Sequence, residues 1–189
     1  IPTLEGLLIE AGASVRITGY DLKKAIYTTI DADIPEPGSV LIGARLFCEM
    51  LRRMPDGIVT VEAENGTVSV KCGKAAFNLV GLSADDYPDL PTVEAENGVS
   101  LPQDLLKKMI NECSFAVSTN ESRPVYMGTL FEIENNVLTM VSVDGYRLAL
   151  RREAVEGYGD DCSFIVPGTA LSDLERLCGD SDERVVLSV

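Results

Sequence analysis

The sequence predicts an α+β fold, with antiparallel sheets that carry amphipathic helices on one face. Three observations support this prediction. Many apolar residues fall in short segments rich in β-branched residues, a few longer segments place them at helical spacing, and the combined pattern occurs twice, roughly 125 residues apart. At 189 residues, the chain is long enough for one large domain or two domains of common size.

The first half begins with three segments that we expect to form strands, LEGLLIEA, SVRITGY and KAIYTTIDADI. The following stretch, GSVLIGARLFCEMLRRMP, changes to a helical period and stops at Pro-Asp-Gly. Its apolar face is predicted to consist of Leu46, Phe47, Met50, Leu51 and Met54. A hairpin around Asn65-Gly66 and a further strand, AAFNLVGL, complete this half.

The second half follows a polar segment with prolines, SADDYPDLPTVEAENG, which is the best candidate linker. We therefore expect a first domain at 1–93, a linker at 94–98 and a second domain at 99–189. The segment VSLPQDLLKKMINECSFAVS predicts a helix with a proline near its first turn. It is followed by predicted strands in TLFEIENN and VLTMVSVDGYRLALRREAV, a strand and a helix in SFIVPGTALSDLERLC, and a last strand in RVVLSV.

The two halves resemble one another. In each, a Gly-Tyr pair follows a strand, at Gly19-Tyr20 and at Gly145-Tyr146, and another strand, an apolar triplet, a glycine and an amphipathic helix come next. A repeat of this size indicates repeated domains rather than a solenoid. We expect the first copy to lack its opening helix and the second to stop before its final strands.

Composition argues against several classes of protein. The chain has 16 basic and 30 acidic residues, so its net charge of −14 disfavours adhesion of the whole surface to DNA or to an anionic membrane. No apolar run approaches the ~18 residues that span a bilayer. The five cysteines form no CxxC pair, which argues against zinc sites and disulfides and favours a reduced, cytosolic setting.

Catalytic chemistry has little basis in this sequence. The absence of histidine removes Ser-His-Asp catalysis, Cys-His catalysis and the HExxH metal helix. An enzyme with paired carboxylates is an alternative, but the acidic pairs Asp85-Asp86 and Asp160-Asp161 lie in polar stretches typical of solvated loops. We expect a non-catalytic protein without cofactor or metal.

The predicted helices carry basic residues against this acidic background. These cations are Arg45, Arg52 and Arg53 in the first helix, Lys107 and Lys108 in the second, and Arg176 in the third. The ordinary solvated side of an amphipathic helix is the simpler interpretation, and Glu49 and Glu175 support it. A similar bias in three helices of repeated domains weakens that interpretation and leaves a shared basic surface as the alternative.

The stretch VSVDGYRLALR, from Val141 to Arg151, allows two interpretations. Asp-Gly between alternating apolar residues is a strong hairpin signal. An aromatic residue and an arginine beside that turn are also residue types that are common at binding hot spots. The pattern alone leaves both interpretations open.

The run SFAVSTNESRPVYMGTLFEIENNVLTMVSVDGYRLALRREAV resembles the middle domain of the bacterial β sliding clamp family, the processivity subunit of DNA polymerase III. DGYRL matches that family's aspartate-glycine-aromatic-arginine-leucine motif, although the family often has histidine where this chain has Tyr146. IPTLEGLLIEA, the arginine-bearing helix before MPDG, and FNLVGLSADDYPDLP are similar to the family's first domain. The resemblance therefore covers essentially all 189 residues.

The resemblance implies a clamp fold in which two three-domain chains close head to tail around duplex DNA, with helices lining the hole and sheets outside. It implies a cytoplasmic, non-catalytic processivity factor with a cleft for polymerases and the clamp loader. The implied cleft residues are Tyr126, Val143, Gly145, Tyr146, Arg147 and Leu148. The implied DNA-facing residues are Arg45, Arg52, Arg53, Lys107, Lys108 and, in the loop STNESRP, Arg123. The implied dimer interface includes Lys74, Phe77 and Leu79, with a place in the local core as the alternative for Leu79.

On this resemblance, the chain lacks the start of the first domain, the end of the second and all of the third. The main rival interpretation is an acidic protein of repeated domains that uses the same groove only for protein partners, without DNA.

Overall fold

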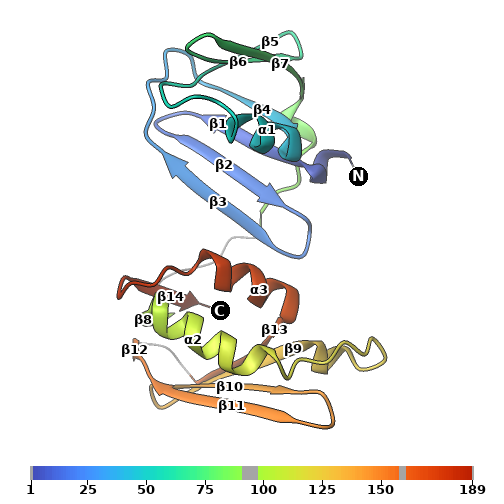
Figure 1. Cartoon of the computed structure of the whole chain (residues 1–189), viewed down its shortest axis with the longest axis vertical. Coiled ribbons are helices and arrows are strands. Elements are labelled where there is room, and N and C mark those ends of the chain that lie inside the picture. Colours follow the sequence, from blue (N-terminus) through green and yellow to red (C-terminus); the bar gives the residue numbers. More distant parts are fainter. Residues whose placement is uncertain (1, 91–97, 158–160, 189) are drawn as a thin grey trace. The chain divides into compact units, whose positions relative to one another are not determined.

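The computed structural model describes residues 2–90, 98–157 and 161–188, which belong to two compact units (Figure 1). Unit 1 comprises Ile1–Pro91, and unit 2 comprises Thr92–Val189. The predicted linker at 94–98 lies outside the described residues except for Gly98, which is the first residue of a strand. Within the described ranges, no helix is long and apolar enough to cross a membrane.

The described residues of unit 1 form a seven-stranded antiparallel sheet in the order β3-β2-β1-β4-β7-β6-β5. Short 3-10 segments, η1 (Pro2–Glu5) and η2 (Ala84–Asp86), lie near its two ends in the sequence. The predicted hairpin is confirmed, because Asn65 and Gly66 join two paired strands with φ of +50° and +76°. The strands are β1 (Gly6–Ala11), β2 (Val15–Tyr20), β3 (Ala25–Ile30), β4 (Gly38–Gly43), β5 (Thr60–Glu64), β6 (Thr67–Cys72) and β7 (Ala75–Leu82).

The helix of unit 1 is shorter than its apolar pattern predicts. The first residues of the stretch GSVLIGARLFCEMLRRMP form β4, α1 spans only Ala44–Leu51, and Met54 lies beyond its end. Phe47 and Met50 are buried against the sheet, where they join a core that includes Ile9, Ile42, Val68 and Val70. The prediction for Leu46 is wrong, since its side chain is 60% exposed. Consecutive residues lie about 100° apart around a helix, so Leu46 points toward solvent when its neighbour Phe47 faces the sheet.

The described residues of unit 2 form two antiparallel sheets, with strand orders β11-β10-β9-β13 and β12-β8-β14. Two helices, α2 (Gln103–Ser114) and α3 (Gly168–Leu177), and the 3-10 segment η3 (Pro124–Met127) complete this part. The strands are β8 (Gly98–Pro102), β9 (Gly128–Glu134), β10 (Val137–Val143), β11 (Leu148–Ala154), β12 (Glu156–Gly157), β13 (Cys162–Pro167) and β14 (Arg184–Ser188).

Strand β8 corrects the sequence prediction, which has these residues open the second helix. Val99 and Leu101 are buried and alternate with half-buried neighbours, which is the period of a strand. Pro102 then stands before the helix as its N-cap, in extended backbone. The pattern is hard to find in the sequence because the strand has only five residues and runs directly into α2.

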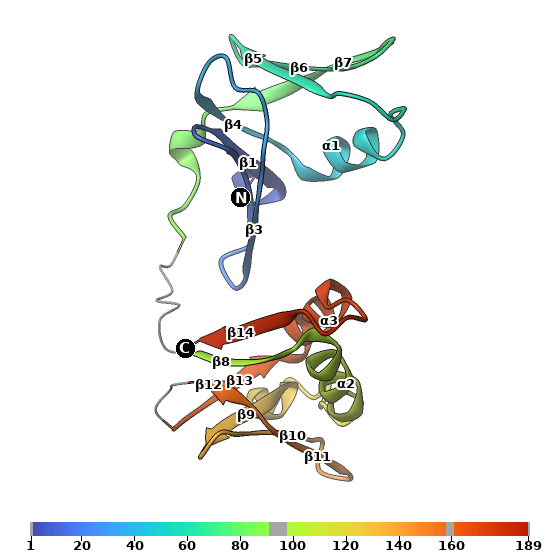
Figure 2. The ribbon, with the colours of Figure 1, turned by 90° about the vertical axis from the view of Figure 1, so that its left-hand side faces the viewer.

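Helices α2 and α3 contact each other and cover the sheets of unit 2 from one side (Figure 2). The α2 side chains Leu106, Met109, Ile110 and Cys113 are fully buried, as is Leu171 of α3. They pack on apolar side chains of the sheets, among them Phe131, Leu138 and Met140. The one-sided placement of helices predicted from the sequence is therefore confirmed in this unit.

The internal repeat is visible in the strand order. In unit 1, β3-β2-β1-β4 is followed by α1, and in unit 2, β11-β10-β9-β13 is followed by α3. The proposed match between the two Gly-Tyr pairs is wrong. Gly19 and Tyr20 lie inside β2 and pair with β3, whereas Gly145 and Tyr146 lie in the turn between β10 and β11.

Candidate functional site

The turn between β10 and β11 is a tight hairpin with an aspartate at its start. The Asp144 N–H donates to the Arg147 carbonyl over 3.3 Å, and Val143 pairs with Leu148 just outside the turn. Asp144 Oδ1 accepts hydrogen bonds from the backbone N–H groups of Tyr146 at 2.9 Å and Arg147 at 3.1 Å. Gly145 has φ of +94°, a conformation that glycine adopts without strain. The hairpin prediction for this stretch is therefore confirmed.

The side chain of Arg147 is held from two directions. Its Nε donates to Asp144 Oδ2 over 2.8 Å, and its guanidinium carbon lies 5.6 Å from the centroid of the Phe115 ring. That distance is typical of a cation–π contact. The backbone N–H of Tyr146, followed by the N–H and guanidinium of Arg147, lowers the pKa of Asp144. The carboxylate is therefore stabilised in its charged form at neutral pH.

The hairpin exposes a set of apolar side chains. Tyr146 is 100% exposed and Leu148 is 61% exposed. Val143 is half-buried and faces the same side of the sheet as its cross-strand partner Leu148. Leu150, two residues further along β11, has the same orientation and is 49% exposed.

Tyr126, the remaining predicted cleft residue, comes from a different element. It lies in η3, immediately before β9, and its side chain is half-buried. Its carbonyl accepts a hydrogen bond from the Ser118 N–H at 2.8 Å, and the guanidinium of Arg123 lies 5.8 Å from its ring centroid. The structure thus groups Val143 and the residues at 145–148 at one hairpin. Tyr126 lies on the segment that leads into β9, the strand that pairs with β10.

The cations predicted to face DNA divide into two groups. Arg45 pairs with Glu49 at 3.0 Å, and Lys107 pairs with Asp180 at 2.6 Å. The side chains of Arg52, Arg53, Lys108 and Arg123 are exposed. Arg176, on α3, lies 3.8 Å from Asp173. Some helix cations thus have acidic partners within their own unit, as the simpler interpretation of a solvated helix side expects.

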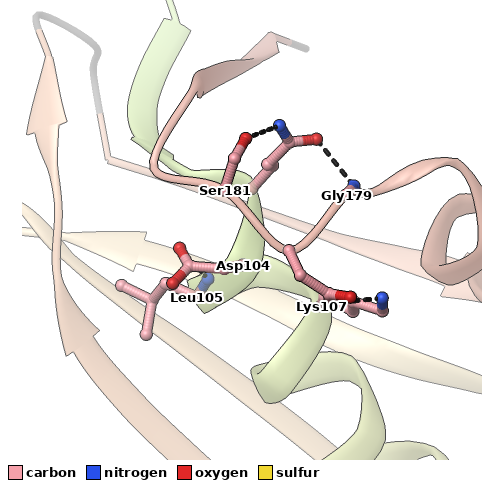
Figure 3. Close-up of polar contacts among 7 residues, drawn as sticks. Asp104, Leu105, Lys107, Gly179 and Ser181 are labelled. Atoms are coloured by element: carbon pink, nitrogen blue, oxygen red, sulfur yellow. Dashed lines mark hydrogen bonds and ion pairs between the residues drawn. The ribbon is translucent and has the colours of Figure 1, made fainter.

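The partner of Lys107 belongs to the loop between α3 and β14. Figure 3 shows this loop crossing the first turn of α2, with Gly179 and Ser181 directed at that helix. Gln103 joins them, since its Oε1 accepts from the Gly179 N–H at 2.7 Å and its Nε2 donates to Ser181 Oγ at 2.5 Å. The Gln103 N–H also donates to the Glu183 carbonyl over 2.8 Å. The loop therefore supplies partners to a helix end that otherwise lacks them.

The predicted interface residues lie on or beside β7. Strand β7 pairs with β6 along most of its length but with β4 only at Leu82 and Gly81, so its other edge is open over 75–80 among the described pairings. Phe77 is 44% exposed, whereas Leu79 is half-buried and packs against the core of unit 1. Lys74 is exposed in the preceding turn.

The described residues hold no group of three His, Cys, Asp or Glu side chains that could bind a metal ion. All five cysteines are free, and Cys113 and Cys178 are buried. Burial is the main cause that raises the pKa of both thiols, which disfavours the nucleophilic thiolate.

Comparison with protein families decides the membership of this chain. The family described as the N-terminal domain of the DNA polymerase III beta subunit matches residues 1–91, and its central domain matches residues 100–189. The chain belongs to the DNA polymerase III beta subunit family. Its α+β clamp fold agrees with the fold class predicted from the sequence.

Relatives in this family are similar to this chain along essentially its whole length. The chain is 36% identical over 197 residues to the Beta sliding clamp of Bacillus subtilis and 35% identical over 202 residues to that of Halalkalibacterium halodurans. These matches cover 98% and 100% of the chain but 52% and 53% of the relatives. The chain therefore spans about half the length of the relatives that it matches.

Solved structures of the family superimpose closely on the chain. The DNA polymerase sliding clamp from Bacillus subtilis has a TM-score of 0.95 at 34% identity, and the DNA polymerase III subunit beta from Pseudomonas aeruginosa has 0.93 at 27%. Each match covers 100% of this chain and 53% of the solved chain.

Three residues of the candidate surfaces were not predicted from the sequence. Leu150 could have been found, because it follows Leu148 at the two-residue spacing of one sheet face. Phe115 and Asp180 are brought to Arg147 and Lys107 only by the tertiary fold, and no local signal marks them.

Proposed function

We propose that the full-length protein is a DNA sliding clamp, the non-catalytic processivity factor of the bacterial replicative DNA polymerase. In this proposal it encircles duplex DNA as a ring and tethers polymerases and the clamp loader through a peptide-binding cleft. The observation that carries the proposal is the hairpin at 144–147, where the family's DGYRL motif exposes an aromatic ring beside an arginine held by Asp144 and Phe115. The relatives called Beta sliding clamp support the same function.

The proposed cleft would bind a short apolar peptide from a partner. Val143, Leu148 and the exposed ring of Tyr146 offer apolar surface, and Tyr126 would add a further wall. The arginine head of Arg147 keeps donors free to orient polar groups of the peptide, because a guanidinium has five N–H groups and Asp144 uses only some of them. Aromatic and arginine side chains of this kind commonly dominate binding energy.

The proposed DNA surface needs only weak, sequence-independent contacts. A ring that is topologically linked to DNA stays on it without high affinity, so a few cations on the helices suffice for phosphate contact. We assign this role to Arg45, Arg52, Arg53, Lys107, Lys108 and Arg123. The net charge of −14 would keep the remaining surface from adhering to DNA.

We propose that the full-length protein closes its ring as a homodimer, in which β7 of one copy contacts the second copy. The open edge of β7 and the exposed Phe77 support this role, because an apolar edge strand favours pairing with another chain. Leu79 and Lys74 would flank the contact.

In the same proposal, 1–93 is the first domain, 94–98 the linker and 99–189 the middle domain of a three-domain chain. A full-length gene product without a third copy of the repeat would contradict this division.

The proposal also implies a cytoplasmic protein that needs no cofactor, and the five free cysteines support a reducing compartment. The rival is an acidic protein of repeated domains with protein partners only. One experiment distinguishes the proposed clamp from this rival. The full-length protein is loaded on nicked circular DNA by a clamp loader, and DNA-bound protein is separated from free protein by gel filtration. A clamp stays with the circle and is lost when the circle is cut, whereas the rival shows no difference between circular and linear DNA.

A further inference from the structure

Lys107, which the proposed function assigns to DNA contact, is already paired with Asp180. Lys107 Nζ lies 2.6 Å from Asp180 Oδ1, with the lysine side chain 28% exposed and the aspartate 88% exposed. The hydrogen bond to Asp180 is the main cause that raises the pKa of Lys107. The lysine is thus fully charged but already has an anion within contact distance.

The loop that carries Asp180 also contacts α2 through residues other than this ion pair. The residues on both sides of it, Gly179 and Ser181, are hydrogen-bonded to the Gln103 side chain (Figure 3). The loop also packs closely on Gln103, because a Cβ added at Gly179 would lie 3.3 Å from its Oε1. The contacts of the loop with α2 therefore place the backbone of Asp180 within reach of Lys107.

We propose that Asp180 is an internal competitor of DNA phosphate for Lys107, and that it lowers the affinity of this helix surface for DNA. The inference rests on the proposed function, in which α2 faces the duplex. A phosphate that approaches Lys107 must displace the carboxylate or share the ammonium with it. Exchange is feasible because exposed ion pairs are weak and are screened by salt.

Lys108 provides the contrast within the same helix. Its side chain is exposed, and no ion pair is seen for it among the described residues. When a DNA phosphate binds Lys108, we expect the counterions of that phosphate to be released in full. A phosphate that binds Lys107 instead replaces the carboxylate of Asp180. A similar arrangement occurs on α1, where Glu49 contacts Arg45 at 3.0 Å. Paired carboxylates would thus keep phosphate contacts weak enough for movement along DNA.

The test compares two charge-neutral substitutions in one loop of the full-length protein. Asp180→Asn removes the proposed competitor, and Asp182→Asn removes an exposed carboxylate two residues away as the matched control. Affinity for a short labelled duplex is measured by fluorescence anisotropy over a series of salt concentrations. Circular dichroism and thermal melting establish that both variants keep the native fold.

We expect Asp180→Asn to tighten DNA binding about twofold to fivefold more than Asp182→Asn, the range that an exposed ion pair allows. The slope of log affinity against log salt should steepen by about 0.9, the contribution of one more neutralised phosphate. Both excess effects should disappear in a Lys107→Gln background, because the competitor then has no lysine to occupy. Equal gains in Asp180→Asn and Asp182→Asn would overturn the proposal, since they would reflect net charge alone.

Failure of this inference is distinguishable from failure of the proposed function. If Lys108→Glu weakens DNA binding while neither Lys107→Gln nor Asp180→Asn changes it, α2 still faces DNA and only the competitor role is wrong. If no helix cation affects DNA binding at all, both the proposed DNA surface and the inference drawn from it are overturned.

Discussion

Asp21 and Asp144 occupy the same position in the hairpins of the two units. The Oδ1 atom of each accepts hydrogen bonds from the backbone N–H groups two and three residues later, at 2.9 Å and 2.8 Å for Asp21 and at 2.9 Å and 3.1 Å for Asp144. The residue after each aspartate has positive φ, +70° for Leu22 and +94° for Gly145. One turn design thus presents two lysines in unit 1 and a Tyr-Arg pair in unit 2.

The first prediction concerns backbone strain in these two turns. A Cβ at Gly145 would meet no atom within 4 Å, so Gly145→Ala tests only the cost of positive φ. We expect it to lower the free energy of unfolding by about 1 kcal/mol, and Leu22→Gly to leave it unchanged or raise it by up to about 1 kcal/mol. Urea unfolding of the two variants measures both. A clear loss for Leu22→Gly would mean that its side chain, 53% exposed, contributes packing that outweighs the strain.

The second prediction concerns the pH dependence of the hairpin at 144–147. The folded pKa of Asp144 lies below its usual value of 3.8, first because of the Tyr146 N–H, so its carboxylate stabilises the turn fully above that value. The stabilisation is lost as pH falls through the folded pKa. The amide resonances of Tyr146 and Arg147 should titrate with a midpoint below 3.8, and the change should be absent in Asp144→Ala. A midpoint above 3.8 would contradict the assigned contacts.

The third prediction separates the proposed dimer interface from the core. Phe77→Ser should favour monomers in the full-length protein with little loss of stability, because the ring is 44% exposed. Leu79→Ser should lower the free energy of unfolding by about 2 kcal/mol or more, since Leu79 packs against the core of unit 1. Val80→Ser, on the opposite face of β7 and 76% exposed, is the control and should change neither property. Sedimentation and denaturation measure the two effects, and a dimer that persists in Phe77→Ser would exclude that side chain from the interface.

The fourth prediction concerns the exposed helix cations. Arg52→Glu and Lys108→Glu should weaken binding to duplexes of different sequence by similar factors, because phosphates carry no sequence information. Each should also reduce the salt slope by about 0.9, if one phosphate contact is lost. Arg152→Glu, an exposed arginine on β11, is the control for net charge. Similar losses in all three variants would show that overall charge, rather than the helix surface, governs binding.

Much of the fold was predictable because its signals are local. The alternating residues at the start of β2, the Asn65-Gly66 turn and the buried α2 positions at Leu106 and Met109 each follow from a few neighbouring residues. Strand β8 was missed because its two buried residues run straight into a helix. The Gly-Tyr match failed because the same residue pair can sit within a strand or in a turn, and only pairing partners distinguish the two.

The candidate site was predictable only in part. Residues of the DGYRL motif are consecutive, so the hairpin and its resemblance to a known family identify them together. Phe115 approaches Arg147, and Asp180 approaches Lys107, from 32 and 73 positions away in the sequence, and neither belongs to a motif. Contacts of this kind depend on how α2 packs against β11 and α3, which no local pattern specifies.

The most direct test of the central claim is a titration of a polymerase-tail peptide against the full-length protein. Arg147→Ala and Leu148→Ala remove the held guanidinium and an apolar side chain that is 61% exposed, so neither should disturb the core. We expect each to weaken peptide binding by ~2 kcal/mol, roughly thirtyfold. Arg152→Ala, on the same strand β11, is the matched control and should bind as the unmodified protein does. Unchanged affinity in both Arg147→Ala and Leu148→Ala, with the fold intact, would contradict the cleft and leave the turn a hairpin without a binding role.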